Sequence, residues 1–291
     1  MNILAVYWDV DPVIFSLGKL EVRYYGLFFV IAFTIGYYIF KYFFKREEIS
    51  LKLLDPLLYT LIIGTLVGAR LGHCLFYQPD YYLANPIEIL YVWEGGLASH
   101  GGAIALLLAM WWFARRYGRK NQFNFLWILD RLGITVALAG FFIRMGNLMN
   151  SEIYGNETTL PWGFVFLRKG ELVAKHPTQI YEALAYLLLF VFLIFLYRKK
   201  LPKLKEGTLF GIFLLVLFAA RFFIEYIKEP QVTFEENMVL NMGQILSIPF
   251  IFAGAILLLY SIMRGKPAMR TIPQEKKQNK QPPLSTTRGT Y

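Results

Sequence analysis

The chain has 291 residues, of which 56% are hydrophobic, 18% aromatic and 17% charged, and its net charge is +10. This composition is too apolar for a soluble domain of this size, and the apolar runs are long enough to span a bilayer. The positive charge does not indicate nucleic-acid binding, because Lys and Arg stand in short clusters between the apolar runs. The single cysteine, Cys74, excludes an internal disulfide framework.

The N-terminal residues 1–21 predict a short arm outside the membrane. Residues 13–17 and 20–23 suit the two strands of a hairpin with Gly18 at the turn. The stretch lacks the basic start and apolar run of a cleavable signal peptide, so we expect the first apolar helix to remain in the mature protein.

Seven apolar runs follow, and each is long enough to cross a membrane as a helix. They cover residues 24–44, 54–77, 97–114, 123–144, 177–197, 208–227 and 242–263. The polar segment 145–176 between the fourth and fifth runs is too long for a turn and predicts a small head domain. The sequence therefore predicts an all-α integral membrane protein with a seven-helix membrane domain over 22–265. A disordered cytoplasmic tail is expected over 266–291.

The distribution of Lys and Arg predicts the orientation of these helices. Twenty of the 30 Lys and Arg residues follow the first, third, fifth and seventh runs, and only seven lie on the other side. The positive-inside rule therefore places the N-terminus in the periplasm and the C-terminus in the cytoplasm.

With that orientation, unusual polar residues gather at one depth near the outer surface. Arg144, Asn147, Asn150, Glu152 and Gly155 form the densest stretch, where the fourth run ends. The others lie at the outer ends of further runs: Tyr25, Arg70, His100, Arg221 and Glu225. Ionisable groups inside a membrane cost a few kcal/mol or more each, so we expect these side chains to line one cavity facing the outer leaflet.

Structural interpretations stand beside this prediction. Arg221 and Glu225, one helical turn apart, could form an ion pair with no further role. Arg70 could extend to lipid headgroups, and His100 could be a hydrogen-bonded histidine between helices. Asp130 and Arg131 favour a structural role, paired across helices.

The chemistry of such a cavity favours an anionic lipid headgroup. Guanidinium groups bind phosphate with two parallel hydrogen bonds and stabilise a departing phosphate as its charge grows. No metal or other cofactor is expected, because His73, His100 and His176 lie on three separate segments without close ligand pairs. An intramembrane protease and a lipid transporter remain alternatives, although the sequence lacks paired aspartates and matching broken halves.

Several motifs closely resemble the phosphatidylglycerol–prolipoprotein diacylglyceryl transferase family, in matching order over most of the chain. They are Tyr25-Gly26-Leu27, Gly68-x-Arg70-x-Gly72, His100-Gly101-Gly102, Arg144-x-Gly146-Asn147-x-x-Asn150-x-Glu152-x-x-Gly155, Gln179-x-Tyr181-Glu182 and Arg221-x-x-x-Glu225. The chain departs from the family pattern at Ile143, at Leu217, and at Lys228, where relatives have an arginine.

The resemblance implies a transfer of the diacylglyceryl group of phosphatidylglycerol to the lipobox cysteine of preprolipoproteins in the bacterial inner membrane. The partners implied are phosphatidylglycerol, lipobox signal peptides and membrane lipid, with no nucleic acid. By the same resemblance, we expect catalytic roles for His100, Tyr25, Arg221 and Glu152. The residues expected to bind substrate are Arg144, Asn147, Gly155, Glu225 and Arg70. His100 is the first candidate for removing the thiol proton, with Glu152 and Tyr25 as alternatives.

Overall fold

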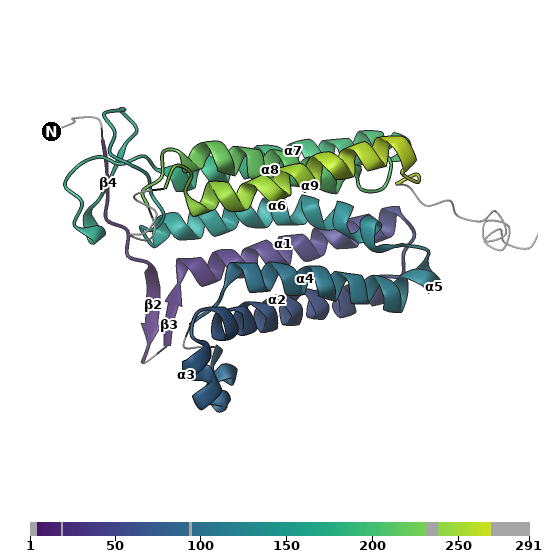
Figure 1. The fold of residues 1–291 in the computed structure, drawn as a ribbon, viewed down its shortest axis with the longest axis horizontal. Coiled ribbons are helices and arrows are strands. Elements are labelled where there is room, and N and C mark those ends of the chain that lie inside the picture. The colour runs from purple at the N-terminus through teal and green to yellow at the C-terminus, as the bar shows by residue number, and fades with distance from the viewer. Residues whose placement is uncertain (1–4, 19, 93–94, 231–237, 269–291) are drawn as a thin grey trace, which may run out of the picture.

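The computed structural model describes residues 5–18, 20–92, 95–230 and 238–268, and helices dominate these ranges (Figure 1). The long helices are α1 (Tyr24–Arg46), α2 (Leu54–Phe76), α4 (Ser99–Phe113), α6 (Phe125–Met149), α7 (Thr178–Lys200), α8 (Thr208–Glu225) and α9 (Met242–Arg264). The short elements are β1 (Val6–Trp8), β2 (Val13–Leu17), β3 (Leu20–Arg23), β4 (Phe164–Phe166), α3 (Pro79–Ala84) and α5 (Arg119–Asn121).

The long helices run side by side as one elongated bundle (Figure 1). The β2–β3 hairpin, α3 and the segment 150–177 lie at one end of this bundle, which we call the arm end. Helix α9 finishes at the opposite end, where α5 also lies, and we call this the tail end. The short elements and the longest connection therefore gather at the arm end of the bundle.

Six helices of the described residues are long and apolar enough to cross a membrane, namely α1, α2, α6, α7, α8 and α9. These confirm the prediction of a helical, multi-pass membrane protein. Helix α4, over the third predicted run, has 15 residues and is not among the six. A π-helical turn at Ala114–Gly118 and then α5 continue its course to Asn121.

Helix α6 is the centre of the bundle. Its most apolar stretch is 61% buried, whereas the corresponding stretch of α7, the next most buried, reaches 33%, and α6 packs against α1, α7 and α8. It begins where the Asn124 side chain accepts a hydrogen bond from the Trp127 backbone N–H at 2.9 Å, which caps the first turn. Because three helices pack around α6, the residues of its last turn can contact side chains from several helices.

Helices α2 and α4 form a close pair through small residues. A Cβ added at Gly68 would overlap Ala105 and the Gly101 carbonyl, and one at Gly72 would lie 2.7 Å from the Gly101 Cα. Glycine and alanine at such an interface let two helix backbones approach closely without a hydrophobic driving force in lipid. This packing explains why glycines flank Arg70 and follow His100.

The arm end contains two small sheets of two strands each. Strands β2 and β3 form the predicted antiparallel hairpin, with a register irregularity between Val13 and Phe15. Strand β1 pairs in parallel with β4, which the sequence did not indicate because both strands have only three residues. The Trp8 indole N–H also donates to the Leu148 carbonyl at 3.1 Å, so the arm is fixed to the last turn of α6.

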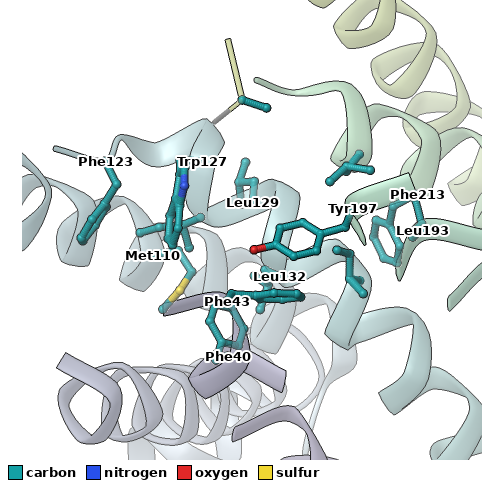
Figure 2. Packing of buried hydrophobic residues seen from close by; sticks show 14 of the residues in the cluster. Phe40, Phe43, Met110, Phe123, Trp127, Leu129, Leu132, Leu193, Tyr197 and Phe213 are labelled. Atoms are coloured by element: carbon teal, nitrogen blue, oxygen red, sulfur yellow. The ribbon is translucent and has the colours of Figure 1, made fainter. Parts of the chain in front are cut away.

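An aromatic core fills the tail end between α1, α4, α6 and α7 (Figure 2). Within it lies a buried ion pair, since Arg131 contacts Glu47 at 2.8 Å and neither side chain is exposed. Glu47 also accepts hydrogen bonds from the Trp127 indole and the Tyr197 hydroxyl, each at 2.7 Å. The structural role predicted for Arg131 is therefore confirmed, with a partner at the C-terminal end of α1.

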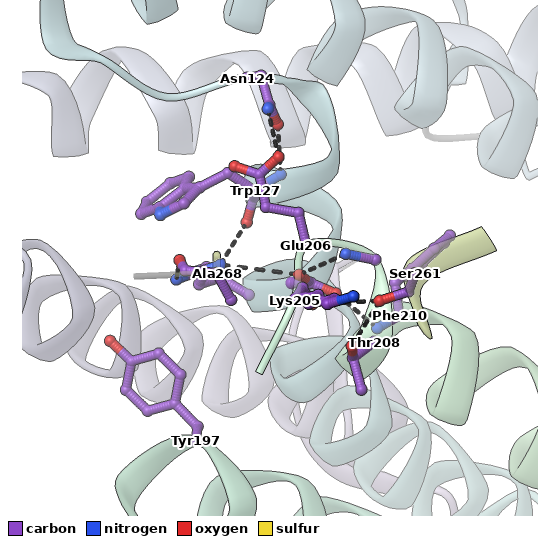
Figure 3. Close-up of polar contacts among 12 residues, drawn as sticks. Asn124, Trp127, Tyr197, Lys205, Glu206, Thr208, Phe210, Ser261 and Ala268 are labelled. Carbon is purple, nitrogen blue, oxygen red and sulfur yellow. Dashed lines mark hydrogen bonds and ion pairs between the residues drawn. The ribbon is translucent and has the colours of Figure 1, made fainter. Parts of the chain in front are cut away.

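The start of α8 and the end of α9 meet at the same end (Figure 3). Thr208 and Ser261 share a hydrogen bond at 2.7 Å, and Asn124 donates to Glu206 at 2.6 Å. Asp130 caps α8 by accepting from the backbone N–H groups of Gly207 and Phe210. Residues 266–268 of the predicted tail lie against this region, where Ala268 donates to Leu204 at 2.8 Å. The rest of that predicted tail lies outside the described residues.

Arg131→Met is expected to destabilise the protein by about 3–5 kcal/mol, because it leaves the Glu47 carboxylate buried without its counter-charge. The midpoint of unfolding in detergent measures this loss. Arg23→Met is the matched control, since the Arg23–Glu21 pair is exposed and such pairs contribute little. Equal midpoints for the two variants would contradict the assignment.

Candidate active site

The last turn of α6 brings Arg144 and Asn147 together. They lie three residues apart on one face of the helix. The Arg144 Nη1 group donates to the Asn147 side-chain oxygen at 3.1 Å. The Asn147 amide then donates to Glu152 at 2.8 Å, and Asn147 is only 5% exposed. These mutual contacts satisfy the polar groups, so α6 continues to Met149, beyond the predicted end at 144.

A strained turn follows, at Ser151 and Ile153, on either side of Glu152. Their φ angles are 50° and 60°, a left-handed conformation that a β-branched residue such as isoleucine rarely adopts. The start of α7 holds this turn, because Thr178 donates to the Ile153 carbonyl at 2.8 Å and Gln179 donates to the Glu152 carbonyl at 2.7 Å. Backbone strain of this kind costs about 1–3 kcal/mol and gathers at functional sites.

A series of alternating charges joins α6, α7 and α8 at the arm end, and we call it the ion chain. Arg144 contacts Glu182 at 2.9 Å, Lys228 contacts Glu182 at 3.1 Å and Glu225 at 2.9 Å, and Arg221 lies 4.0 Å from Glu225. Its middle three members are at most 8% exposed. Each buried charge in the middle of the ion chain therefore has an opposite charge on both sides.

The two ends of the ion chain are more open than its middle. The Arg221 side chain is 33% exposed, and that of Arg144 is 12% exposed. The buried Nε of Arg221 has no hydrogen-bond partner among the described residues. Two guanidinium groups at the ends of a neutralised chain can accept an anion without leaving a buried carboxylate unpaired.

Tyr25 and Gly155 complete this region by close packing. The Tyr25 ring covers Gly146, where an added Cβ would lie 2.7 Å from the ring. The backbone at Gly155 crosses the segment that follows α8 and forms a β-bridge with Lys228. A Cβ added at Gly155 would overlap the Ile227 carbonyl. The structure thus places Gly155 as a crossing point that positions Lys228.

The segment 150–177 is held together by its own polar contacts. The Tyr154 hydroxyl donates to Glu171 at 2.7 Å, and burial together with this hydrogen bond raises the pKa of Tyr154, so the phenol stays protonated. Lys175 binds Glu229, which follows α8. These contacts anchor the segment beside Lys228.

A large apolar groove lies next to Arg144, with a volume of about 930 Å³. It is bounded by α1, α2, α4 and α6, and it reaches from Tyr25 and Ile143 at the arm end to Tyr37 and Asp55 further along the bundle. The twelve residues from Tyr25 to Tyr37 correspond to about 18 Å, slightly more than half of a hydrocarbon core. An apolar groove whose wall includes Ile143, the residue before Arg144, suits an amphipathic anion.

Two of the expected site residues lie apart from the ion chain. His100 is the exposed second residue of α4, and its side chain forms no hydrogen bond or ion pair with the described residues. Arg70 is buried and donates to the carbonyls of Glu88, Ile89 and Gly95 at 2.5–2.9 Å. These bonds occupy guanidinium N–H groups that a lipid headgroup would require. Within the described residues, Arg70 therefore fixes the loop that follows α3.

The contacts bring together Arg144, Asn147, Glu152, Glu225 and Arg221, with Tyr25 and Gly155 beside them. Two members of the ion chain, Glu182 and Lys228, were not among the expected site residues. Lys228 follows Glu225 by three residues, a spacing that could have indicated the pair.

These features define a multi-pass helical membrane protein with a charged site at one end of the bundle and an apolar groove that reaches the same end. The model of the prolipoprotein diacylglyceryl transferase family matches residues 12–260. The phosphatidylglycerol–prolipoprotein diacylglyceryl transferase of Tolumonas auensis is 49% identical over 88% of this chain and 97% of the relative. The Porphyromonas gingivalis protein of the same name is 45% identical over 88% of this chain and 95% of its own length. The chain therefore belongs to the prolipoprotein diacylglyceryl transferase family.

Gly155→Ala is expected to lower transferase activity at least tenfold, because the new methyl group displaces residues 226–228 and with them Lys228. Initial rates with the folded variant measure the effect. Gly36→Ala is the control, since a Cβ there meets nothing within 4 Å. Full activity in Gly155→Ala would show that the crossing does not support the site.

Proposed function

We propose that the protein transfers the diacylglyceryl group of phosphatidylglycerol to the lipobox cysteine thiol of preprolipoproteins, the first step of lipoprotein maturation. The observation that carries this proposal is the ion chain, whose first member Arg144 directly follows Ile143 in the wall of the apolar groove. The groove suits two acyl chains, and the guanidinium groups of Arg144 and Arg221 suit the phosphate. Membership of the family supports the same reaction.

The reaction needs no covalent enzyme intermediate. The cysteine sulfur attacks the glyceryl carbon that carries the phosphate, a C–S bond forms, and the C–O bond to phosphate breaks. Glycerol phosphate leaves with the electron pair, and its growing charge is stabilised by Arg144 and Arg221. Asn147 donates to a polar oxygen of the headgroup, and Glu225 orients Arg221.

The thiol proton has three candidate acceptors. His100 is exposed at the start of α4, and its neighbours Ala98 and Gly102 line the groove, which brings α4 to the side of the bound lipid. Glu152 contacts Asn147, and Tyr25 lines the groove on the opposite wall. We propose His100 as the base, because a neutral imidazole accepts a proton near neutral pH.

We propose seven membrane crossings, counting α4 and its continuation to Asn121 as the third. This run of 23 helical residues extends about 35 Å, enough to span a bilayer. The basic clusters after α1, α4 and α7 gather at the tail end, which favours a cytoplasmic position for that end. The arm and the head segment 145–176 then lie in the periplasm, and the site faces the outer leaflet of the inner membrane.

Arg221→Ala should lower transfer by at least about a hundredfold with folding intact, because one donor to the leaving phosphate is lost. Arg221→Lys should also fail substantially, since a lysine cannot bind phosphate with two parallel hydrogen bonds. The assay incubates purified protein with labelled phosphatidylglycerol and a lipobox peptide and measures the mass added to the cysteine.

Arg168→Ala is the control for these variants, because Arg168 is an exposed arginine at the same end. Near-normal transfer in Arg221→Ala would refute its assignment. Cleavage of the peptide would indicate a protease, and lipid flux in sealed vesicles without covalent product would indicate a transporter.

Ala103→Trp should block the groove, because Ala103 lines its wall. Transfer from long-chain phosphatidylglycerol should fall at least tenfold, and transfer from a dihexanoyl analogue should fall less. Leu108→Trp is the matched control, since Leu108 is an exposed residue of the same helix outside the groove lining. An equal loss with both lipids would show that the groove does not hold acyl chains.

A further inference from the structure

Lys228 has an unusual environment for a lysine. Its side chain is 3% exposed, and its ammonium lies 3.1 Å from a Glu182 oxygen and 2.9 Å from a Glu225 oxygen. Lysine is almost never this buried unless it is paired. Here one ammonium group forms ion pairs with two carboxylates that are themselves buried, so it neutralises part of the charge of each.

The position of Lys228 is fixed by the backbone. It forms a bridge with Gly155, and the neighbouring Asn156 N–H donates to the Ile227 carbonyl at 2.8 Å. Lys228 does not line the apolar groove. Its only ion pairs within the described part of the chain are with the two glutamates, so it acts on a ligand through them.

The charges around Lys228 balance. The ion chain holds three cations and two anions, and Glu152 adds a third anion through Asn147. A bound phosphate diester changes this neutral set to a net charge of about minus one. Without Lys228 the set would begin at minus one, and the same ligand would bring it to minus two in a region of low dielectric.

The geometry of Glu182 and Glu225 adds a second effect. Each glutamate contacts Lys228 on one side and an arginine on the other. If Lys228 were absent, each buried carboxylate would keep only the arginine as its counter-charge and would attract more of that guanidinium group. Donors of Arg144 and Arg221 would then turn away from the ligand.

We propose that Lys228 is a positioning residue that selects an anionic headgroup, because it neutralises Glu182 and Glu225 and so leaves Arg144 and Arg221 free to bind phosphate. This inference rests on the proposed function in one respect, that the ligand of the two arginines is a lipid phosphate. Lys228 itself touches no substrate.

The test compares Lys228→Met, which has a similar unbranched side chain without the charged ammonium group, with Lys228→Arg, which keeps the charge. Dissociation constants are measured for phosphatidylglycerol and for diacylglycerol, which has the same acyl chains and no phosphate. Lys228→Met is expected to weaken phosphatidylglycerol binding at least tenfold and to leave diacylglycerol binding within about twofold. Lys228→Arg should stay within about threefold for both lipids.

Lys175→Met is the matched control, because Lys175 is another buried lysine paired with glutamates but lies outside the ion chain. Its affinity ratio between the two lipids should equal that of the unchanged protein. Unaltered phosphatidylglycerol binding in Lys228→Met would overturn the proposal, as would an equal loss of both lipids. A failure of the proposed function is distinguishable, since it would appear as absent transfer to the peptide by the unchanged protein.

Discussion

The pairing of buried charges along Arg144, Glu182, Lys228, Glu225 and Arg221 constrains the whole arm end of the bundle. A buried charge without a partner costs several kcal/mol, so none of these residues can move or change sign without affecting its neighbours. The surrounding backbone is arranged accordingly. The strained turn around Glu152 and the close crossing at Gly155 hold the neighbouring segments in the positions that this pairing requires.

A second buried network at the tail end shows what a purely structural arrangement looks like. Arg131 donates to Glu47, to the Trp127 carbonyl and to the Ala268 carbonyl, and it stacks on the Trp127 ring at 4.4 Å. Its side chain has no exposed surface. The ion chain differs because its terminal arginines are partly exposed, and one of them, Arg144, directly follows Ile143 in the wall of an apolar groove. That difference separates a site that can bind a ligand from one that only stabilises the fold.

The sequence indicated the helices well, because long apolar runs have few other uses in a membrane protein. It placed the hairpin at residues 13–23, and it gathered Arg144, Asn147, Glu152, Arg221 and Glu225 into one site. It did not reveal that Arg70 is occupied by loop carbonyls, since backbone acceptors leave no trace in side-chain spacing. It noted Lys228 as a departure from the family pattern and did not reveal its pairing with Glu182, because that residue lies 46 positions away on another helix. The continuation of α6 beyond Arg144 was missed because the polar residues there pair with each other, which the sequence does not reveal.

The most direct measurement is a structure of the protein in a lipid nanodisc containing phosphatidylglycerol. The account predicts density for one phosphate within hydrogen-bonding distance of both Arg144 and Arg221, with the acyl chains between α1 and α2. It also predicts that Lys228 still contacts both glutamates and not the lipid. A phosphate bound elsewhere at the arm end, for example beside Arg70 and His73, would contradict it, as would a lipid held by only one of the two arginines.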